Sequence, residues 1–165
     1  MQIAKQVSLF VTITLWAIII GGVIYSHIVY FPPYLSHLPE SNNLITGEYG
    51  LQEGNFWMLV HPFVILSLII TLILNWKLAT RRKFILIAFS IYALAIVATA
   101  LYFLPELKAF AAGSDSTTVT PAEWYQRGQR WQHLSWIRGA SLFVGFIMLL
   151  IALIKDKQRT IADVN

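Results

Sequence analysis

The sequence predicts an all-α polytopic membrane protein, a bundle of four transmembrane helices with both termini in the cytoplasm. Of its 165 residues, 57% are hydrophobic and only 12% are charged, which excludes an ordinary water-soluble domain. A membrane span needs roughly 20 mainly apolar residues to cross about 30 Å of hydrocarbon. Four segments approach or exceed that length: residues 7–30, 56–76, 84–104 and 131–154. No stretch remains for a soluble domain, so residues 1–165 are predicted to form one membrane domain.

The first span is expected to stay in the protein and not to act as a cleaved signal peptide. It is longer than 20 residues and ends in Tyr-Phe-Pro-Pro, which differs from a small-residue cleavage site. Gly21-Gly22 would let a neighbouring helix approach closely. Pro32-Pro33 are expected to end this helix, and residues 31–55 then form the first external loop.

Prolines mark the second and third spans. Pro62 lacks an amide hydrogen and disfavours helical geometry in the residue before it, so we expect His61 at a kink or a helix start. The third span leaves the membrane through Leu104-Pro105-Glu106, where Pro105 is expected to loosen backbone pairing beside an acidic side chain. The second external loop covers residues 105–120.

The fourth span has the clearest beginning. Thr120-Pro121-Ala122-Glu123 has the pattern of a capping box, with proline at the first helical position, so its helix is expected to begin well outside the membrane. Further along this helix, the spacing of Trp131, Ser135 and Arg138 places them on one face.

An arginine as deep in a span as Arg138 is costly against lipid. It is therefore expected to face the bundle interior, with Glu53 or Glu106 as its carboxylate partner.

Basic residues define the orientation, because positively charged loops stay on the cytoplasmic side. One predicted side holds most of them: Lys5, Lys77, Arg81, Arg82, Lys83, Lys155, Lys157 and Arg159. Both termini are therefore placed in the cytoplasm, which suits a plasma or inner membrane. The net charge of +4 is explained by this topology and does not indicate nucleic-acid binding. The absence of cysteine excludes disulfides, thiolate metal ligands and covalently attached c-type haem.

Three histidines fall where spans meet the same predicted external face of the bilayer. They are His27, His61 and His133, and Glu106 lies at the same level. Imidazole nitrogens and a carboxylate suit a transition metal such as copper, iron or zinc, so these four residues are the predicted metal ligands. Haem is the less favoured alternative, with His27 and His133 as axial ligands. The competing interpretation is that interfacial histidines are tolerated because their polar tips reach water.

Three features of the chain suggest a family: the order of the spans, the Gly21-Gly22 pair before an extended outer loop, and the segment Trp131-Gln-His-Leu-Ser135-Trp-Ile-Arg138. In these features the chain resembles the anthrone oxygenase-like family of small four-helix membrane proteins. Ser135 departs from the asparagine that family members often carry. Trp131 and Arg138 are the only residues that match the family's pattern position by position. The resemblance implies oxidation of a hydrophobic aromatic substrate by oxygen.

These observations lead to three functional hypotheses. The first is a metal- or haem-dependent oxidoreductase or oxygenase acting on a hydrophobic small molecule, in which Arg138 stabilises an anionic intermediate, Glu106 accepts a proton and Trp131 walls the pocket. The second is a non-enzymatic binding or assembly protein. The third and weakest is a small-molecule carrier, which would need a homo-oligomer because the chain has no detectable inverted repeat.

Overall fold

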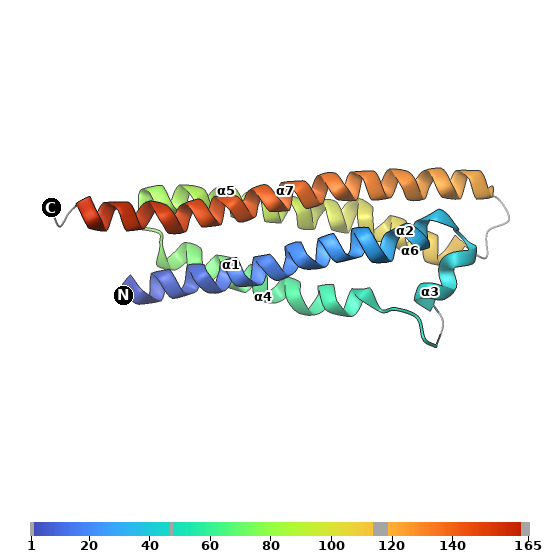
Figure 1. The fold of residues 1–165 in the computed structure, drawn as a ribbon, viewed down its shortest axis with the longest axis horizontal. Coiled ribbons are helices and arrows are strands. Elements are labelled where there is room, and N and C mark those ends of the chain that lie inside the picture. Colours follow the sequence, from blue (N-terminus) through green and yellow to red (C-terminus); the bar gives the residue numbers. More distant parts are fainter. Residues whose placement is uncertain (1, 47, 114–118, 163–165) are drawn as a thin grey trace.

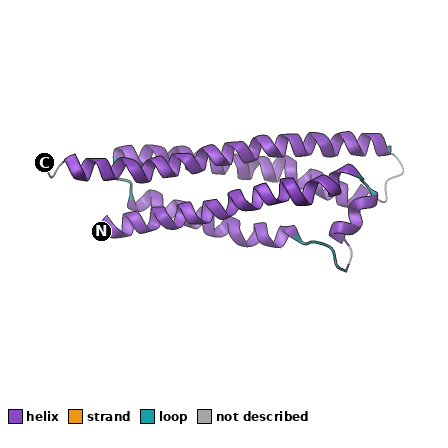
Figure 2. Ribbon diagram, viewed as in Figure 1, coloured by secondary structure: helices purple, strands orange, loops and turns teal. Residues whose placement is uncertain are grey.

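The computed structural model describes residues 2–46, 48–113 and 119–162, with side chains described up to Lys155. All the secondary structure in these ranges is helical (Figure 2). The chain forms α1 (Gln2–Tyr25), a π-helical turn η1 (Ser26–Tyr30), α2 (Phe31–Ser36), a 3₁₀ turn η2 (Glu40–Asn42), α3 (Asn43–Thr46), α4 (Glu53–Leu74), α5 (Ala79–Ala98), a second π-helical turn η3 (Thr99–Phe103), α6 (Leu104–Ala112) and α7 (Pro121–Ala162).

Four long helices, α1, α4, α5 and α7, run side by side and alternate in direction along the chain (Figure 1). Helix α1 packs against α4 and α7, and α5 packs against α7 and α4. We call the end where α1 begins and α7 ends the terminal end, and the opposite end, which carries α2, α3 and α6, the loop end. The predicted all-α four-helix bundle is therefore confirmed.

Each of the four helical segments is long and apolar enough to cross a membrane. They are Gln2–Ser36, Glu53–Leu74, Ala79–Ala112 and Pro121–Lys155, and the mean hydropathy of their most apolar stretches is 2.4 to 2.5. The surface of the bundle carries many large exposed apolar side chains, including Phe10, Phe63 and Leu94. Such a surface is stable when hydrocarbon surrounds it, so the structure supports an integral membrane protein.

The centre of the bundle is held by Trp16 of α1, whose side chain is fully buried. Its indole Nε1 donates a hydrogen bond to the backbone oxygen of Leu142 at 3.0 Å, and its ring meets Tyr92 edge-on at 5.0 Å. Nearer the terminal end, the hydroxyls of Thr12 and Thr71 lie 2.8 Å apart in the core and join α1 to α4. Small polar contacts of this kind link helices that gain no hydrophobic free energy from meeting inside lipid.

Both π-helical turns lie directly before prolines, which explains their position. Pro32, Pro33 and Pro105 lack the amide hydrogen that a regular helix uses for its bond four residues back. The backbone instead makes bonds to the fifth residue back, from the amide of Phe31 to Ser26 and from the amide of Leu104 to Thr99. The expected loosening at Pro105 is confirmed. The expectation that Pro32-Pro33 end the first helix is wrong, because the chain continues helically to Ser36.

The other two sequence predictions about helix ends have opposite outcomes. Helix α7 begins at Pro121, and the Thr120 amide and the Glu123 carboxylate are 2.8 Å apart, as a capping box requires. Helix α4, in contrast, runs through Pro62 without a break and begins at Glu53, eight residues before His61. His61 therefore does not lie at a helix start. Pro62 is the tenth residue of α4, beyond the first turn, so the helix forgoes one backbone hydrogen bond at that position.

The terminal end contains a buried cation, Arg81, in the first turn of α5. Arg81 is 3% exposed, and its guanidinium donates to the backbone oxygen of Ala152 in α7 and to the side chain of Asn75. These bonds tie the α4–α5 turn to the last helix. Arg81 therefore has a packing role in addition to its contribution to the charge asymmetry.

Candidate functional site

A polar cluster lies inside the bundle, on the loop-end side of the Trp16 core, with Arg138 of α7 at its centre. The guanidinium donates hydrogen bonds to the Thr99 hydroxyl at 2.6 Å and to the Ser135 hydroxyl at 2.9 Å. Its carbon also lies 4.1 Å from the centre of the Phe103 ring, a cation–π contact. The prediction that Arg138 faces the bundle interior is confirmed, and its direct partners are hydroxyls and an aromatic ring.

Glu53, in the first turn of α4, is the carboxylate that faces this arginine. Its carboxylate accepts hydrogen bonds from the Ser26 hydroxyl and from the side chain of Trp57. It interacts electrostatically with Arg138, but among the described residues the two form no direct ion pair. The side chains of Glu53 and Arg138 thus each bond to neutral partners and not to each other.

His27 supplies a buried lone pair beside the cluster. The ring is 3% exposed and lies between Phe31 and Trp136, whose centres are 5.4 and 4.5 Å away. Its Nδ1 is 2.7 Å from the backbone oxygen of Val23, and because a carbonyl only accepts, Nδ1 must carry the hydrogen. In the neutral ring, Nε2 is then a bare acceptor, and it has no hydrogen-bond partner in the structure.

His61 approaches the same arginine from α4. It is half-buried and stacks on Trp57, with ring centres 5.6 Å apart. Its Nδ1 lies 2.6 Å from the hydroxyl of Tyr92, which comes from α5. Both His27 and His61 are near enough to Arg138 to interact with its charge. All four spans therefore contribute to one polar cluster.

The two π-helical turns contribute residues to this site. Ser26 and His27 belong to η1, and Thr99 and Phe103 belong to η3. A π turn holds one more residue per turn than the helix around it, which changes the face on which the following side chains project. Such turns occur often at functional sites. Here both bring polar side chains toward Arg138.

The predicted metal ligands do not come together. Within the ranges that the structure describes, no three histidine, aspartate or glutamate side chains lie where they could share a metal ion. His133 is exposed, because it lies two residues from the buried Trp131, about 200° around the helix. Glu106 forms a 2.9 Å ion pair with Arg127 at the loop end. The structure therefore does not bring His27, His61, His133 and Glu106 together around one metal ion.

Trp131, the other predicted site residue, lies in the core of the loop end. It is 1% exposed, and its indole Nε1 donates to the backbone oxygen of Phe103 at 3.0 Å. It packs edge-on against Phe31 and Phe103, at 4.6 and 5.5 Å. Trp131 thus supports the wall behind His27 and Arg138.

Sequence reasoning did not select three residues that the structure places in the site: Ser26, Thr99 and Tyr92. Single hydroxyl side chains are common in apolar spans, and the spacing of these three residues in the sequence does not link them to Arg138. Glu53 was considered only as a partner for that arginine. The signal that could have found Ser26 and Thr99 is their position six residues before a proline, where the backbone bonding changes.

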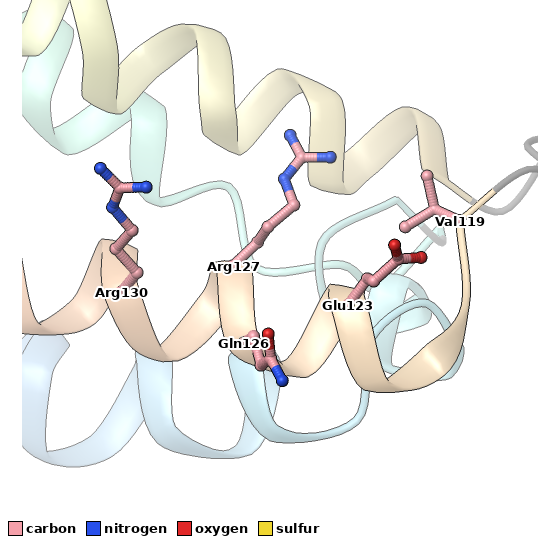
Figure 3. A pocket seen from close by; sticks show the side chains of 5 residues that line it. All are labelled: Val119, Glu123, Gln126, Arg127 and Arg130. Atoms are coloured by element: carbon pink, nitrogen blue, oxygen red, sulfur yellow. The ribbon is translucent and has the colours of Figure 1, made fainter.

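Two cavities lie near the loop end. The first, of about 540 Å³, lies between α1 with η1 and the start of α4, and its lining includes Ser26 and Glu53 of the polar cluster. The second, of about 450 Å³, is lined by Val119 and by Glu123, Gln126, Arg127 and Arg130 of α7 (Figure 3). In Figure 3 these side chains come from α7 and from Val119, two residues before it. Arg127 is already paired with Glu106. The first cavity is therefore the better candidate for a binding site.

Comparisons with models of protein families, with curated proteins and with solved structures find no match for this chain.

Proposed function

We propose that this integral membrane protein binds a lipid-soluble small molecule at the Arg138 cluster, with both its termini on the cytoplasmic side of a plasma or inner membrane. The observation that supports binding is the separation of Glu53 from Arg138, each of which bonds to hydroxyl groups and not to the other. A charged pair inside a membrane is expensive, and such groups usually mark a site of function. A bound molecule with polar atoms would complete the cluster.

The cluster offers three kinds of contact to the polar part of such a molecule. The guanidinium of Arg138 has five N–H donors, and its two hydrogen bonds leave others available. The carboxylate of Glu53 accepts hydrogen bonds. The bare Nε2 of His27 accepts a hydrogen bond or a proton. A site with a fixed positive charge next to a proton acceptor suits a reaction in which the bound molecule loses a proton and becomes anionic.

The more specific form of this proposal is an oxidoreductase or oxygenase, which the family resemblance implies. In that form His27 accepts a proton from the substrate, and Arg138 stabilises the resulting anion. A bound metal or haem stays a prediction, and these two roles do not depend on it.

The test is to purify the protein in mild detergent without a histidine tag. Elemental analysis, an absorption spectrum and mass spectrometry of an organic extract would then be recorded. We expect one lipid-soluble compound enriched well above bulk lipid, and at least tenfold less of it in Arg138→Gln. Because Arg138→Gln could fail to fold, Thr99→Val and Ser135→Ala, which each remove one of its hydroxyl partners, are measured beside it.

Two results would decide against this proposal. One is an extract that contains no enriched compound. The other is an enriched compound whose amount is the same in all three variants. A metal-free protein without a bound compound that reproducibly purifies with one partner protein would instead favour the assembly hypothesis.

A further inference from the structure

The cavity beside Glu53 opens on the outer surface of the bundle, where lipid surrounds a membrane span. Its mouth is formed by exposed positions of α1, among them Ile18, Gly21 and Tyr25. Phe56 of α4 lines the opposite side. We call this cavity the α1–α4 groove. A molecule dissolved in the bilayer can reach it sideways, without passing through water.

Glycines give the groove its depth. A Cβ atom at Gly22 would lie 2.7 Å from the Phe56 ring and 3.0 Å from the indole of Trp57, so any larger residue there would force these rings to shift. A Cβ at Gly21 would meet no atom within 4 Å. The space above Gly21 is therefore open, and its width suits an apolar chain lying along α1.

The inner end of the groove is polar. Ser26, Gln52 and Glu53 line it, and Glu53 is the only carboxylic acid among the residues that line the groove. Tyr30 donates a long hydrogen bond of 3.4 Å to the backbone oxygen of Leu51, and both residues also line the groove. An elongated molecule would place its apolar part against Gly21 and its polar head against Glu53.

The charges select among head groups. A carboxylate or phosphate head would meet the negative charge of Glu53. A cationic amine would add a positive charge next to Arg138, whose electrostatic interaction with Glu53 already compensates that carboxylate. A neutral hydroxyl head adds no charge of either sign, and it can donate a hydrogen bond to the Glu53 carboxylate.

We propose that the α1–α4 groove binds a lipid-soluble molecule with a neutral hydroxyl head, which donates to Glu53, and an apolar chain, which lies over Gly21. This inference rests on the proposed function and names the chemical class and the route of its ligand. It assigns Glu53 as the residue that selects the head group.

The test uses three brominated long-chain probes of equal length, an alcohol, an amine and a carboxylate, added to the full-length protein in lipid nanodiscs. Bromine quenches tryptophan fluorescence at contact, and Trp57 lies against the groove wall. We expect saturable quenching by the alcohol, at least tenfold weaker binding of the amine and the carboxylate, and loss of the saturable part in Trp57→Phe.

Gly21 provides matched variants because its Cβ meets nothing. Gly21→Leu fills the groove and should weaken alcohol binding at least tenfold, whereas Gly21→Ala should change it little. Glu53→Gln should reduce the preference for the alcohol over the carboxylate. Equal, unsaturable quenching by all three probes would overturn the proposal, as would alcohol binding that Gly21→Leu does not affect.

The outcomes separate this inference from the proposed function. If Arg138→Gln loses the extracted compound while Gly21→Leu keeps it, the ligand binds at the cluster but not through the α1–α4 groove. If both variants keep it, both proposals fail.

Discussion

Replacing Gly145 by alanine should destabilise the bundle, whereas the same change at Gly21 should not. A Cβ at Gly145 would lie 2.6 Å from Cζ2 of Trp16 and 3.0 Å from its Cη2. Carbon atoms in contact prefer about 3.5–4.0 Å, so the indole would have to move by about 1 Å. Its bond to the Leu142 oxygen and its contact with Tyr92 oppose that movement.

The size of the effect follows from comparing the two glycines. Overpacking of a tight core costs about 1–3 kcal/mol. Alanine gains about 1 kcal/mol over glycine in a helix, and this gain applies at both positions. It therefore cancels in the difference, and Gly145→Ala should be less stable than Gly21→Ala by about 1–3 kcal/mol.

The free energy of unfolding would be measured in mixed micelles, by titration with a denaturing detergent and circular dichroism. A difference smaller than about 0.5 kcal/mol would show that Trp16 is free to move, contrary to the reasoning above.

Three further predictions use the same assay. In a double-mutant cycle with Thr12→Val and Thr71→Val, the buried hydroxyl pair should have a coupling energy of about 0.6 kcal/mol, and zero coupling would contradict the hydrogen bond between α1 and α4. Glu106 and Arg127 are 26% and 37% exposed, so their coupling in a cycle with glutamine variants should stay below about 1 kcal/mol, and a larger value would point to a site role for Glu106. His133→Ala should change stability by less than about 0.5 kcal/mol and leave any extracted compound unchanged. Loss of a bound metal in that variant would revive the predicted metal site.

The sequence was sufficient to predict the number of spans, their approximate positions and the early start of α7. These follow from hydropathy and from a local cap, which are properties of neighbouring residues. Depth in the membrane could also be estimated, and that estimate placed three histidines at one level. The direction of each side chain around its helix could not be read for isolated residues. His133 shows this, since its side chain is exposed on α7 and does not join the Arg138 cluster.

Arg138 was predictable for a physical reason that His133 lacks. A permanently charged side chain in a span is costly when it faces lipid, so its direction toward the bundle interior can be predicted. A neutral histidine at an interface has no such restriction. The hydroxyls of Ser26 and Thr99 were missed because their orientation depends on the π-helical turns.

The contact between Arg81 and Ala152 bears on how the protein is made. The two residues are 71 positions apart, and α7 leaves the ribosome after α1, α4 and α5. Until that helix is inserted, the guanidinium of Arg81 lacks the carbonyl that it binds in the finished protein. The contact thus makes the final packing of the turn between the second and third spans depend on the insertion of α7. In a nascent polypeptide stopped before Ala152, the turn between the second and third spans would therefore not yet be tied to α7.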